Sequence, residues 1–287
     1  MKYLNGTLLK SNPEKLREKV MFNSDTGEEY MAYYPAGYEV LDYFNHGSQV
    51  NVSTIRRRNG GNGEGGKIFL LKNENPNAEP LPGDELQAVL NPKAIYGAIR
   101  CGIHVGHLVE KCFRPKHAPK IPRVIEGAYI NNNPIRSYLI EELVPGTSLS
   151  EDLFNDLSKT RQKLVLIELA KTIAKMHFRI PDAQLKISRF PTKSYHYYPD
   201  PAKRYKNRQN MVSFFESRKL ALTHSDLISR NILYDGKDVI VLDYGRAWCG
   251  PRLVDFSSLR ITYSENFTHR LMDAYTLVYR LFTKKWR

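Results

Sequence analysis

The N-terminal half of the chain carries the apolar and polar pattern of strands. Runs rich in β-branched and aromatic residues predict strands over 39–44, 50–55 and 67–72. Because turns containing Gly, Asn and Ser separate these runs, we expect the strands to form an antiparallel meander. Upstream, residues 13–22 indicate a short helix that begins at a proline.

The C-terminal half has helical periodicity instead. Apolar residues recur at three- and four-residue steps over 149–157 and 161–178, which predicts two amphipathic helices. Further helices are predicted over 93–113 and 267–282. We expect the core positions of the 161–178 helix to be Leu164, Ile167, Leu169, Ile173, Ala174 and His177.

A predicted hairpin in the second half ends in polar residues. Asn231 opens a short apolar run, residues 235–238 form a turn, and Asp243 follows the returning run. Antiparallel pairing would place Asn231 and Asp243 side by side, and amide and carboxylate oxygens are ligands that suit Mg²⁺. Asp226, in the preceding loop, is a carboxylate that can accept the proton of an attacking hydroxyl. These residues predict a phosphoryl-transfer site.

The order of these residues resembles a known catalytic segment. His224-Ser225-Asp226, Asn231 five residues after Asp226 and Asp243 twelve residues after Asn231 are similar to the aminoglycoside phosphotransferase and choline kinase-like family of the protein-kinase-like superfamily. Leu242-Asp243-Tyr244-Gly245-Arg246-Ala247 agrees with that branch, whereas Asp-Phe-Gly and Ala-Pro-Glu do not occur in the sequence.

The resemblance implies an α+β, two-lobe protein-kinase-like fold with a small antiparallel-sheet lobe and a larger helical lobe. It implies an N-terminal extension over 1–37, a nucleotide-binding lobe over 38–143 and a catalytic lobe over 144–287. The implied activity moves the γ-phosphoryl group of ATP, with Mg²⁺, to a hydroxyl of a small molecule, with GTP left open as the donor. The alternative is a non-catalytic, pseudokinase-like nucleotide-binding or scaffold protein.

The resemblance also implies residues that bind the nucleotide. Lys72, at the end of the third strand, would pair with the phosphates, and the turn at Gly47 and Ser48 would cover them. The Gly-rich run 60–66 is more conspicuous, but it lies between the second and third strands, at the far end of such a meander.

Two further features complete the expected nucleotide site. The apolar strand that leads into Pro145-Gly146 is similar to the family hinge, and it implies that the main chain of Glu141, Glu142 and Leu143 contacts adenine. Lys72 needs a carboxylate partner. Glu110 is chosen for this role and Glu85 is the alternative. His224, His177 and Asp255 are expected to have structural roles.

Composition narrows the class of protein. The three cysteines are scattered without metal-ligand spacing, which favours a reducing compartment, and no run of about 18 apolar residues predicts a membrane span. We therefore predict a cytoplasmic protein. Lys and Arg number 43 against 30 acidic residues, but they are spread along the chain, so no specific nucleic-acid partner is predicted. Few carboxylates lie in 186–220, which favours a neutral or anionic acceptor over a polycationic one.

Overall fold

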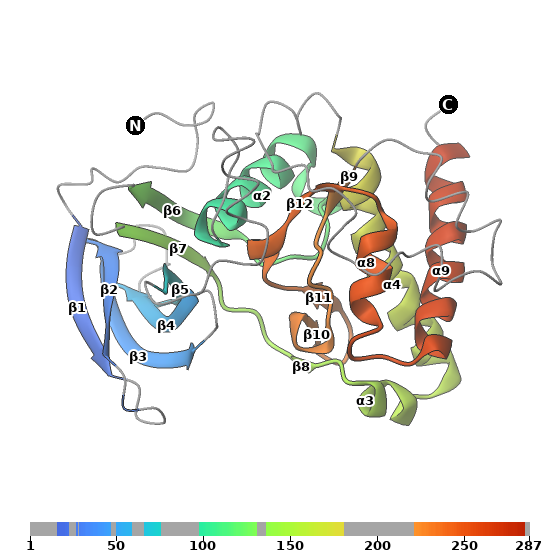
Figure 1. Cartoon of the computed structure of the whole chain (residues 1–287), viewed down its shortest axis with the longest axis horizontal. Coiled ribbons are helices and arrows are strands. Elements are labelled where there is room, and N and C mark those ends of the chain that lie inside the picture. Colours follow the sequence, from blue (N-terminus) through green and yellow to red (C-terminus); the bar gives the residue numbers. More distant parts are fainter. Residues whose placement is uncertain are drawn as a thin grey trace. The chain divides into compact units, whose positions relative to one another are not determined.

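The computed structural model describes residues 16–22, 27, 29–46, 50–58, 66–75, 98–130, 136–180 and 221–284 (Figure 1). The chain divides into two compact units. The first contains residues 1–86, 95–107 and 122–144, and the second contains residues 87–94, 108–121 and 145–287.

The first unit is built on a five-stranded antiparallel sheet with the strand order β3-β4-β5-β7-β6. The predicted meander is confirmed as β3 to β5, and β7 adds to its edge through β5. The strands are β3 (Tyr38–His46), β4 (Val50–Arg57), β5 (Ile68–Glu74), β6 (Val124–Ile130) and β7 (Arg136–Glu142).

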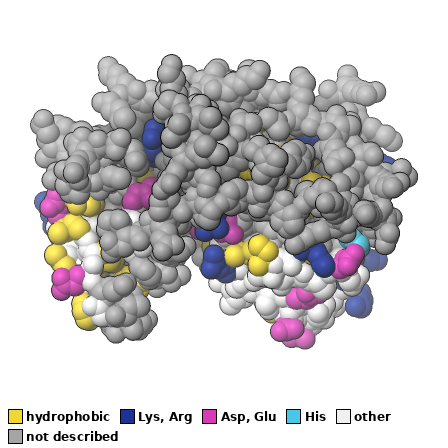
Figure 2. Space-filling view, viewed as in Figure 1, with side chains coloured by type: hydrophobic (Ala, Val, Ile, Leu, Met, Phe, Trp, Pro, Cys, Tyr) yellow, Lys and Arg dark blue, Asp and Glu magenta, His cyan; other side chains and the backbone are white. Residues whose placement is uncertain are grey.

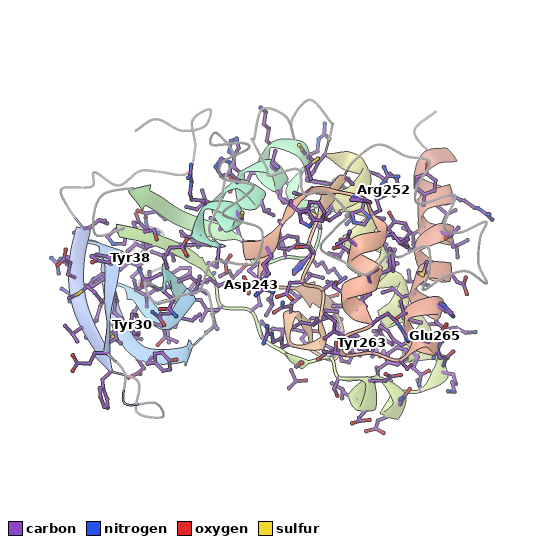
Figure 3. The ribbon with its side chains drawn as sticks, in the orientation of Figure 1. Tyr30, Tyr38, Asp243, Arg252, Tyr263 and Glu265 are labelled. Atoms are coloured by element: carbon purple, nitrogen blue, oxygen red, sulfur yellow. The ribbon has the colours of Figure 1, made fainter. Side chains whose placement is uncertain are left out.

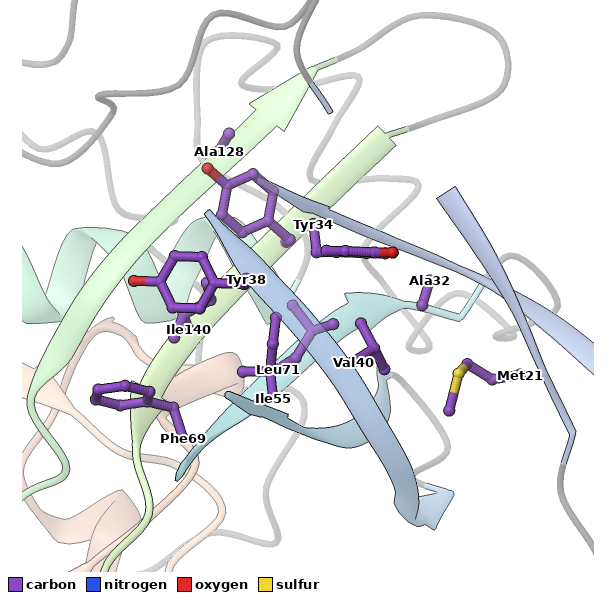
Figure 4. Packing of buried hydrophobic residues seen from close by; sticks show 11 residues of the cluster. Met21, Ala32, Tyr34, Tyr38, Val40, Ile55, Phe69, Leu71, Ala128 and Ile140 are labelled. Carbon is purple, nitrogen blue, oxygen red and sulfur yellow. The ribbon is translucent and has the colours of Figure 1, made fainter. Parts of the chain in front are cut away.

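One face of this sheet packs against a hairpin of β1 (Leu16–Phe22) and β2 (Glu29–Pro35). Figure 4 shows the resulting core, in which Met21 from β1 and Ala32 from β2 meet Leu71 and other side chains of the sheet. The helix predicted over 13–22 is wrong. Residues 16–22 pair one for one with β2, and this partner supplies backbone hydrogen bonds that the local pattern does not reveal.

The opposite face of the sheet packs against α2 (Ala98–Cys112), which confirms the helix predicted in this region. Ile99 and Ile103 are buried against residues of β4, β6 and β7. Two glycines, one turn apart, allow the helix to approach closely. A Cβ at Gly102 would lie 2.7 Å from Leu139 Cδ2, and one at Gly106 would lie 2.4 Å from Val124 Cγ2.

The second unit is mainly helical, with α3 (Glu151–Asp156), α4 (Lys159–Arg179), α8 (Leu253–Leu259) and α9 (Glu265–Lys284). Small antiparallel sheets join β8 (Thr147–Ser148) to the hairpin of β10 (Ile232–Tyr234) and β11 (Val239–Val241), and β9 (Ala221–Thr223) to β12 (Trp248–Gly250). The hairpin predicted around residues 235–238 is confirmed.

The predicted face of α4 is correct at most positions. Leu169, Ile173, Ala174 and His177 are buried, but Leu164 is 47% exposed and its assignment to the core is wrong. The buried side chains of the first two turns are Gln162, Val165 and Leu166, because the helical stripe that ends at His177 passes through them.

Antiparallel strands in one unit and helices in the other agree with the predicted α+β class. Among the described residues, no helix combines the length and apolar character needed to cross a membrane. On the described surface visible in Figure 2, basic and acidic side chains lie intermixed.

Candidate active site

The loop after β9 carries Asp226 on an unusual backbone. Ser225 has φ of 63°, in the left-handed region that costs a residue other than glycine of the order of 1 kcal/mol or more. The buried carboxylate of Asp255 accepts the backbone N–H groups of Ser225 at 2.7 Å and His224 at 3.1 Å. The next N–H, of Leu227, donates to Ser258 Oγ at 3.0 Å. Contacts from α8 therefore hold this conformation on both sides of Asp226.

A buried hydrogen-bond network extends from Asp255. His177 Nε2 lies 2.9 Å from Asp255 Oδ2, and His177 Nδ1 lies 2.7 Å from the Tyr275 hydroxyl. Burial acts to raise the pKa of Asp255, but the hydrogen bonds from His177 and from the Ser225 N–H lower it below its ordinary value. Burial lowers the pKa of His177, against the opposing hydrogen bond to Asp255. We infer an ionised Asp255 and a neutral His177 that donates to it.

His224 has the structural role expected from the sequence. Its Nδ1 accepts the backbone N–H of Asp226 at 3.2 Å, and its Nε2 lies 2.6 Å from the carbonyl oxygen of Leu242. Because an N–H only donates and a carbonyl only accepts, the ring carries its proton on Nε2. His224 therefore joins the loop of Asp226 to the end of the β10–β11 hairpin.

Asp226 and Asn231 are brought together directly. Both side chains are largely buried, and Asn231 Nδ2 donates to the backbone carbonyl of Asp226 at 2.8 Å and to Asp226 Oδ2 at 3.2 Å. Since the amide nitrogen of Asn231 faces these two acceptors, its Oδ1 is left as a ligand for another group.

The hairpin also brings Asn231 and Asp243 to adjacent backbone positions. The N–H of Leu242 donates to the carbonyl of Asn231 at 2.8 Å, and Asp243 follows with φ of 56°. Figure 3 labels the side chain of Asp243. Mg²⁺ is bound through a few protein oxygens, with waters and phosphates as its other ligands. An amide oxygen and a carboxylate next to each other in one hairpin fit such an ion. A direct contact of both side chains with one metal stays a prediction.

Lys72 lies in the interior of the first unit and is 9% exposed. Its ammonium forms an ion pair of 2.8 Å with the equally buried Glu141 of β7. The sheet register explains this contact, because Lys72 lies opposite Leu139 and Leu70 lies opposite Glu141. Residues opposite each other on antiparallel strands share a face, so Lys72 and Glu141 are diagonal neighbours on the side that α2 covers.

Neither of the carboxylates expected to pair with Lys72 is seen to do so. Glu110 is an exposed residue near the end of α2, and Glu85 lies outside the described residues. Lys67, the residue before β5, pairs with Glu142 at 3.5 Å, and both side chains are partly exposed. The sequence therefore missed Glu141 as a partner, because the contact depends on the register between β5 and β7.

The structure describes part of the segment predicted to contact adenine. The N–H of Glu142 donates to the carbonyl of Arg123 at 2.9 Å, so this donor is already used within the protein. Leu143 follows the end of β7 and is 38% exposed, and an adenine contact by its main chain stays a prediction. Gly47 and Ser48 lie outside the described residues.

Two arginines near Asp226 were not among the predicted site residues. Arg230 Nη2 lies 4.0 Å from Asp226 Oδ2, and Arg246 Nη1 lies 3.8 Å from Asp226 Oδ1. The available signal was their position, because Arg230 lies within the segment from Asp226 to Asn231 and Arg246 follows Asp243 by three residues.

The model of the family described as "Phosphotransferase enzyme family", APH, matches residues 111–286, which is more than half of the chain. This chain is a member of the phosphotransferase enzyme family. The resemblance to the aminoglycoside phosphotransferases is thereby confirmed. No curated protein matches the chain.

Solved structures show the fold. The GDP complex of wild-type aminoglycoside 2'-phosphotransferase-IIIa aligns with a TM-score of 0.52 and 13% identity, over 83% of this chain and 78% of that chain. The GDP and kanamycin complex of an APH(2") enzyme aligns with a TM-score of 0.51 and 15% identity, over 84% of this chain and 77% of that chain. The kinase-like α+β fold predicted from the sequence is therefore confirmed.

Proposed function

We propose that the chain transfers the γ-phosphoryl group of ATP to a hydroxyl of a small molecule in a Mg²⁺-dependent reaction. The observation that carries this proposal is the arrangement around Asp226. Its loop is fixed by Asp255, its carboxylate bonds to Asn231, and the β10–β11 hairpin brings Asp243 next to Asn231 in the backbone. Family membership supports the reaction class.

Asp226 is assigned as the group that orients and deprotonates the acceptor. Its carboxylate is largely buried, and one oxygen is already bonded to Asn231, which limits its rotation. A fixed acceptor of protons favours one position of the attacking hydroxyl, and positioning accounts for much of the catalysis of phosphoryl transfer.

Asn231 Oδ1 and the carboxylate of Asp243 are assigned to Mg²⁺. When bound, the ion neutralises charge on the phosphate oxygens as the bond to the leaving group breaks. The protein contributes two hard oxygen ligands and fixes the side-chain amide of Asn231 through its bonds to Asp226.

Lys72 is assigned to the nucleotide phosphates and Glu141 to holding its ammonium. The chain differs from the family in the carboxylate that pairs with this lysine. The first turn of α2 has no acidic residue, and the glutamate of this helix, Glu110, is exposed near its end. Glu141 supplies a carboxylate from the sheet instead. A paired ammonium keeps its position while it can still donate to phosphate oxygens.

Matched variants of the two aspartates test the reaction. In Asp226→Asn the proton acceptor is lost while the shape is kept, so we expect kcat to fall about 10²- to 10⁴-fold with little change in nucleotide affinity. In Asp243→Asn we expect the Mg²⁺-dependent part of nucleotide affinity to fall. The measurements are ADP release with a panel of hydroxyl compounds and calorimetric titration with ATP and with GTP.

The outcomes separate an enzyme from a nucleotide-binding protein without activity. Nucleotide binding without turnover by the natural chain would favour the non-catalytic alternative. Undiminished turnover by Asp226→Asn would remove the assignment of the base.

A further inference from the structure

Two guanidinium groups flank the carboxylate of Asp226. Arg230 approaches one carboxylate oxygen at 4.0 Å and Arg246 approaches the other at 3.8 Å. The Asp226 side chain is 11% exposed, whereas that of Arg246 is 32% and that of Arg230 is 70% exposed. The aspartate is therefore buried at the base of the group, and both cations reach towards solvent.

The two arginines are held by separate turns of the backbone. Arg230 belongs to the 3-10 turn Ser229–Asn231, whose N–H at Ser229 donates to Thr262 Oγ1 at 2.9 Å. Arg246 ends the 3-10 turn Tyr244–Arg246, and its carbonyl accepts the hydroxyl of Ser225. The Asp226 loop and the Asp243 turn thus each present one guanidinium to the same carboxylate.

The N–H groups of both guanidinium groups are available to bind a ligand. Their distances to Asp226 exceed those of hydrogen bonds, and within the part of the chain that the structure describes neither guanidinium donates a hydrogen bond to another residue. A guanidinium presents five N–H groups in a planar fork that matches a carboxylate or a phosphate.

We propose that the hydroxyl compound phosphorylated by this chain carries an anionic group, a carboxylate or a phosphate, which Arg230 and Arg246 bind. The inference rests on the proposed function, since it concerns the acceptor of that reaction. An acceptor whose hydroxyl reaches Asp226 brings its neighbouring atoms within range of both guanidinium groups. An anion there gains two cationic partners and also relieves their mutual repulsion.

The charge of the sequence points the same way. Two guanidinium groups lie within 4.0 Å of the Asp226 carboxylate, and their charges disfavour a polycationic acceptor at this position. Residues 181–220 contain nine Lys and Arg residues against three Asp and Glu residues, so they add no excess of acid that would attract such a compound. The net charge of +13 favours anionic small molecules over cationic ones in the encounter.

The experiment compares acceptors that differ only in charge. The first set is glycerol, glycerate and glycerol 3-phosphate, and the second is glucose, glucuronate and glucose 6-phosphate. Kanamycin represents the polycationic acceptors. Turnover is followed as ADP release with ATP and Mg²⁺. Binding of each compound to the full chain is measured by calorimetry, so that selectivity is determined even where turnover is slow.

We expect the anionic members to exceed their neutral counterparts in affinity or in kcat/KM by about tenfold or more, since a charge-assisted hydrogen bond contributes this much. Arg230→Gln and Arg246→Gln should each reduce that ratio about tenfold with the KM for ATP changed less than about twofold. Arg230→Lys keeps the charge but loses the planar fork of N–H groups, so its selectivity for anions should lie between those of the natural chain and of Arg230→Gln. Comparison of the carboxylates with the phosphates identifies which anion is recognised.

Lys237→Gln is the matched control. It removes one positive charge from an exposed residue in the turn at the other end of the β10–β11 hairpin, and it should leave the selectivity unchanged. The proposal is overturned if neutral compounds or kanamycin bind as well as the anions, or if the arginine variants raise the KM for ATP and leave the acceptor ratio intact. The latter result would assign the arginines to the nucleotide phosphates.

Failure of the proposed function gives a different result. If the chain binds anions through the arginines but does not bind ATP, the proposed phosphotransferase function fails and the anion site is retained. If the chain phosphorylates neutral compounds in preference to anions, the proposed function is supported and the anion site fails.

Discussion

The Asp255 carboxylate accepts the backbone N–H of Ser225 at 2.7 Å, and this contact fixes the residue immediately before Asp226 in a left-handed conformation. The second oxygen of Asp255 is shared between the N–H of His224 and the Nε2 of His177. One buried carboxylate therefore connects α4, α8 and the loop that carries the proposed base. A single change at this position should affect both the stability and the activity of the second unit.

Asp255→Asn should be strongly destabilising. The amide retains one acceptor, but its NH₂ group faces an N–H donor of the protein wherever it is placed, so at least one buried donor loses its partner. We expect a loss of about 3 kcal/mol in the free energy of unfolding, measured by urea denaturation. Asp156→Asn, at an exposed position of α3, is the control and should change it by less than about 0.5 kcal/mol. Equal effects of the two changes would contradict the role of Asp255.

Glu141→Gln should impair nucleotide binding. Removal of the carboxylate charge leaves the buried Lys72 ammonium with a weaker partner, and we expect the KM for ATP to rise about tenfold with a smaller change in kcat. Glu141→Asp keeps the charge and should recover part of the loss. The measurement is the dependence of initial rate on ATP concentration, together with nucleotide titration by calorimetry.

The matched controls are Glu142→Gln and Glu110→Gln. Glu142 is the next residue of β7 and pairs with the partly exposed Lys67, so its charge should matter little for ATP. Glu110 is the carboxylate that the sequence suggested for Lys72. A rise in the KM for ATP in Glu110→Gln, with none in Glu141→Gln, would restore that first assignment.

The features predicted correctly from the sequence are those with local causes. The β10–β11 hairpin has both strands and its turn within a dozen residues, and the sheet of β3 to β5 is a meander of consecutive strands. The motif from His224 to Asp243 adds side chains at fixed spacing to that hairpin. Residue type and spacing were sufficient to predict the hairpin, and the catalytic and metal-binding roles of these side chains stay predictions.

The missed features depend on contacts between distant segments. The strand β1 is defined by its partner β2, and the Lys72–Glu141 contact is defined by the register of β5 with β7. The charge around Asp226 depends on two turns that meet only in the folded chain. None of these relationships is expressed in the pattern of one segment, so they could not be predicted from it.

The contact of α2 with the sheet gives a stability prediction that distinguishes two glycines. Alanine in place of glycine gains about 1 kcal/mol of helix propensity at both positions. At Gly106 the new Cβ would lie 2.4 Å from Val124 Cγ2 and 2.7 Å from its Cβ, which is attached directly to the strand backbone. At Gly102 it would meet only the terminal Cδ2 of Leu139, at 2.7 Å.

We therefore expect Gly106→Ala to lower the free energy of unfolding by about 1–3 kcal/mol, whereas Gly102→Ala should change it by less than about 1 kcal/mol. Urea denaturation of both variants provides the measurement. In a double variant with Val124→Ala, Gly106→Ala should cost less than it does alone, because the clashing methyl groups are removed. Equal costs for the two glycines would show that the helix shifts as a whole.

The raised pKa of the Glu74 carboxyl group should make the stability of the protein depend on pH. Glu74 lies at the end of β5, and its Oε1 accepts the backbone N–H of Ile99 in the first turn of α2 at 3.1 Å. Burial raises the pKa of Glu74 to about 7 from an ordinary value of 4.5, although the hydrogen bond from Ile99 and the charge of Arg100 act to lower it. The protonated form is therefore favoured in the folded protein.

The sign of the pH effect follows from this upward shift. The folded state binds the proton more tightly than the unfolded state, so the contribution of Glu74 is fully present below pH 4.5 and is lost as the pH rises through about 7. Glu74→Gln keeps an uncharged carbonyl acceptor for Ile99. The variant should therefore match the natural chain near pH 4.5 and become more stable than it by roughly 3 kcal/mol at pH 8. Urea denaturation at both pH values measures the difference, from which the other titrating groups cancel. A difference that stays constant with pH would show that folding does not shift the pKa of Glu74.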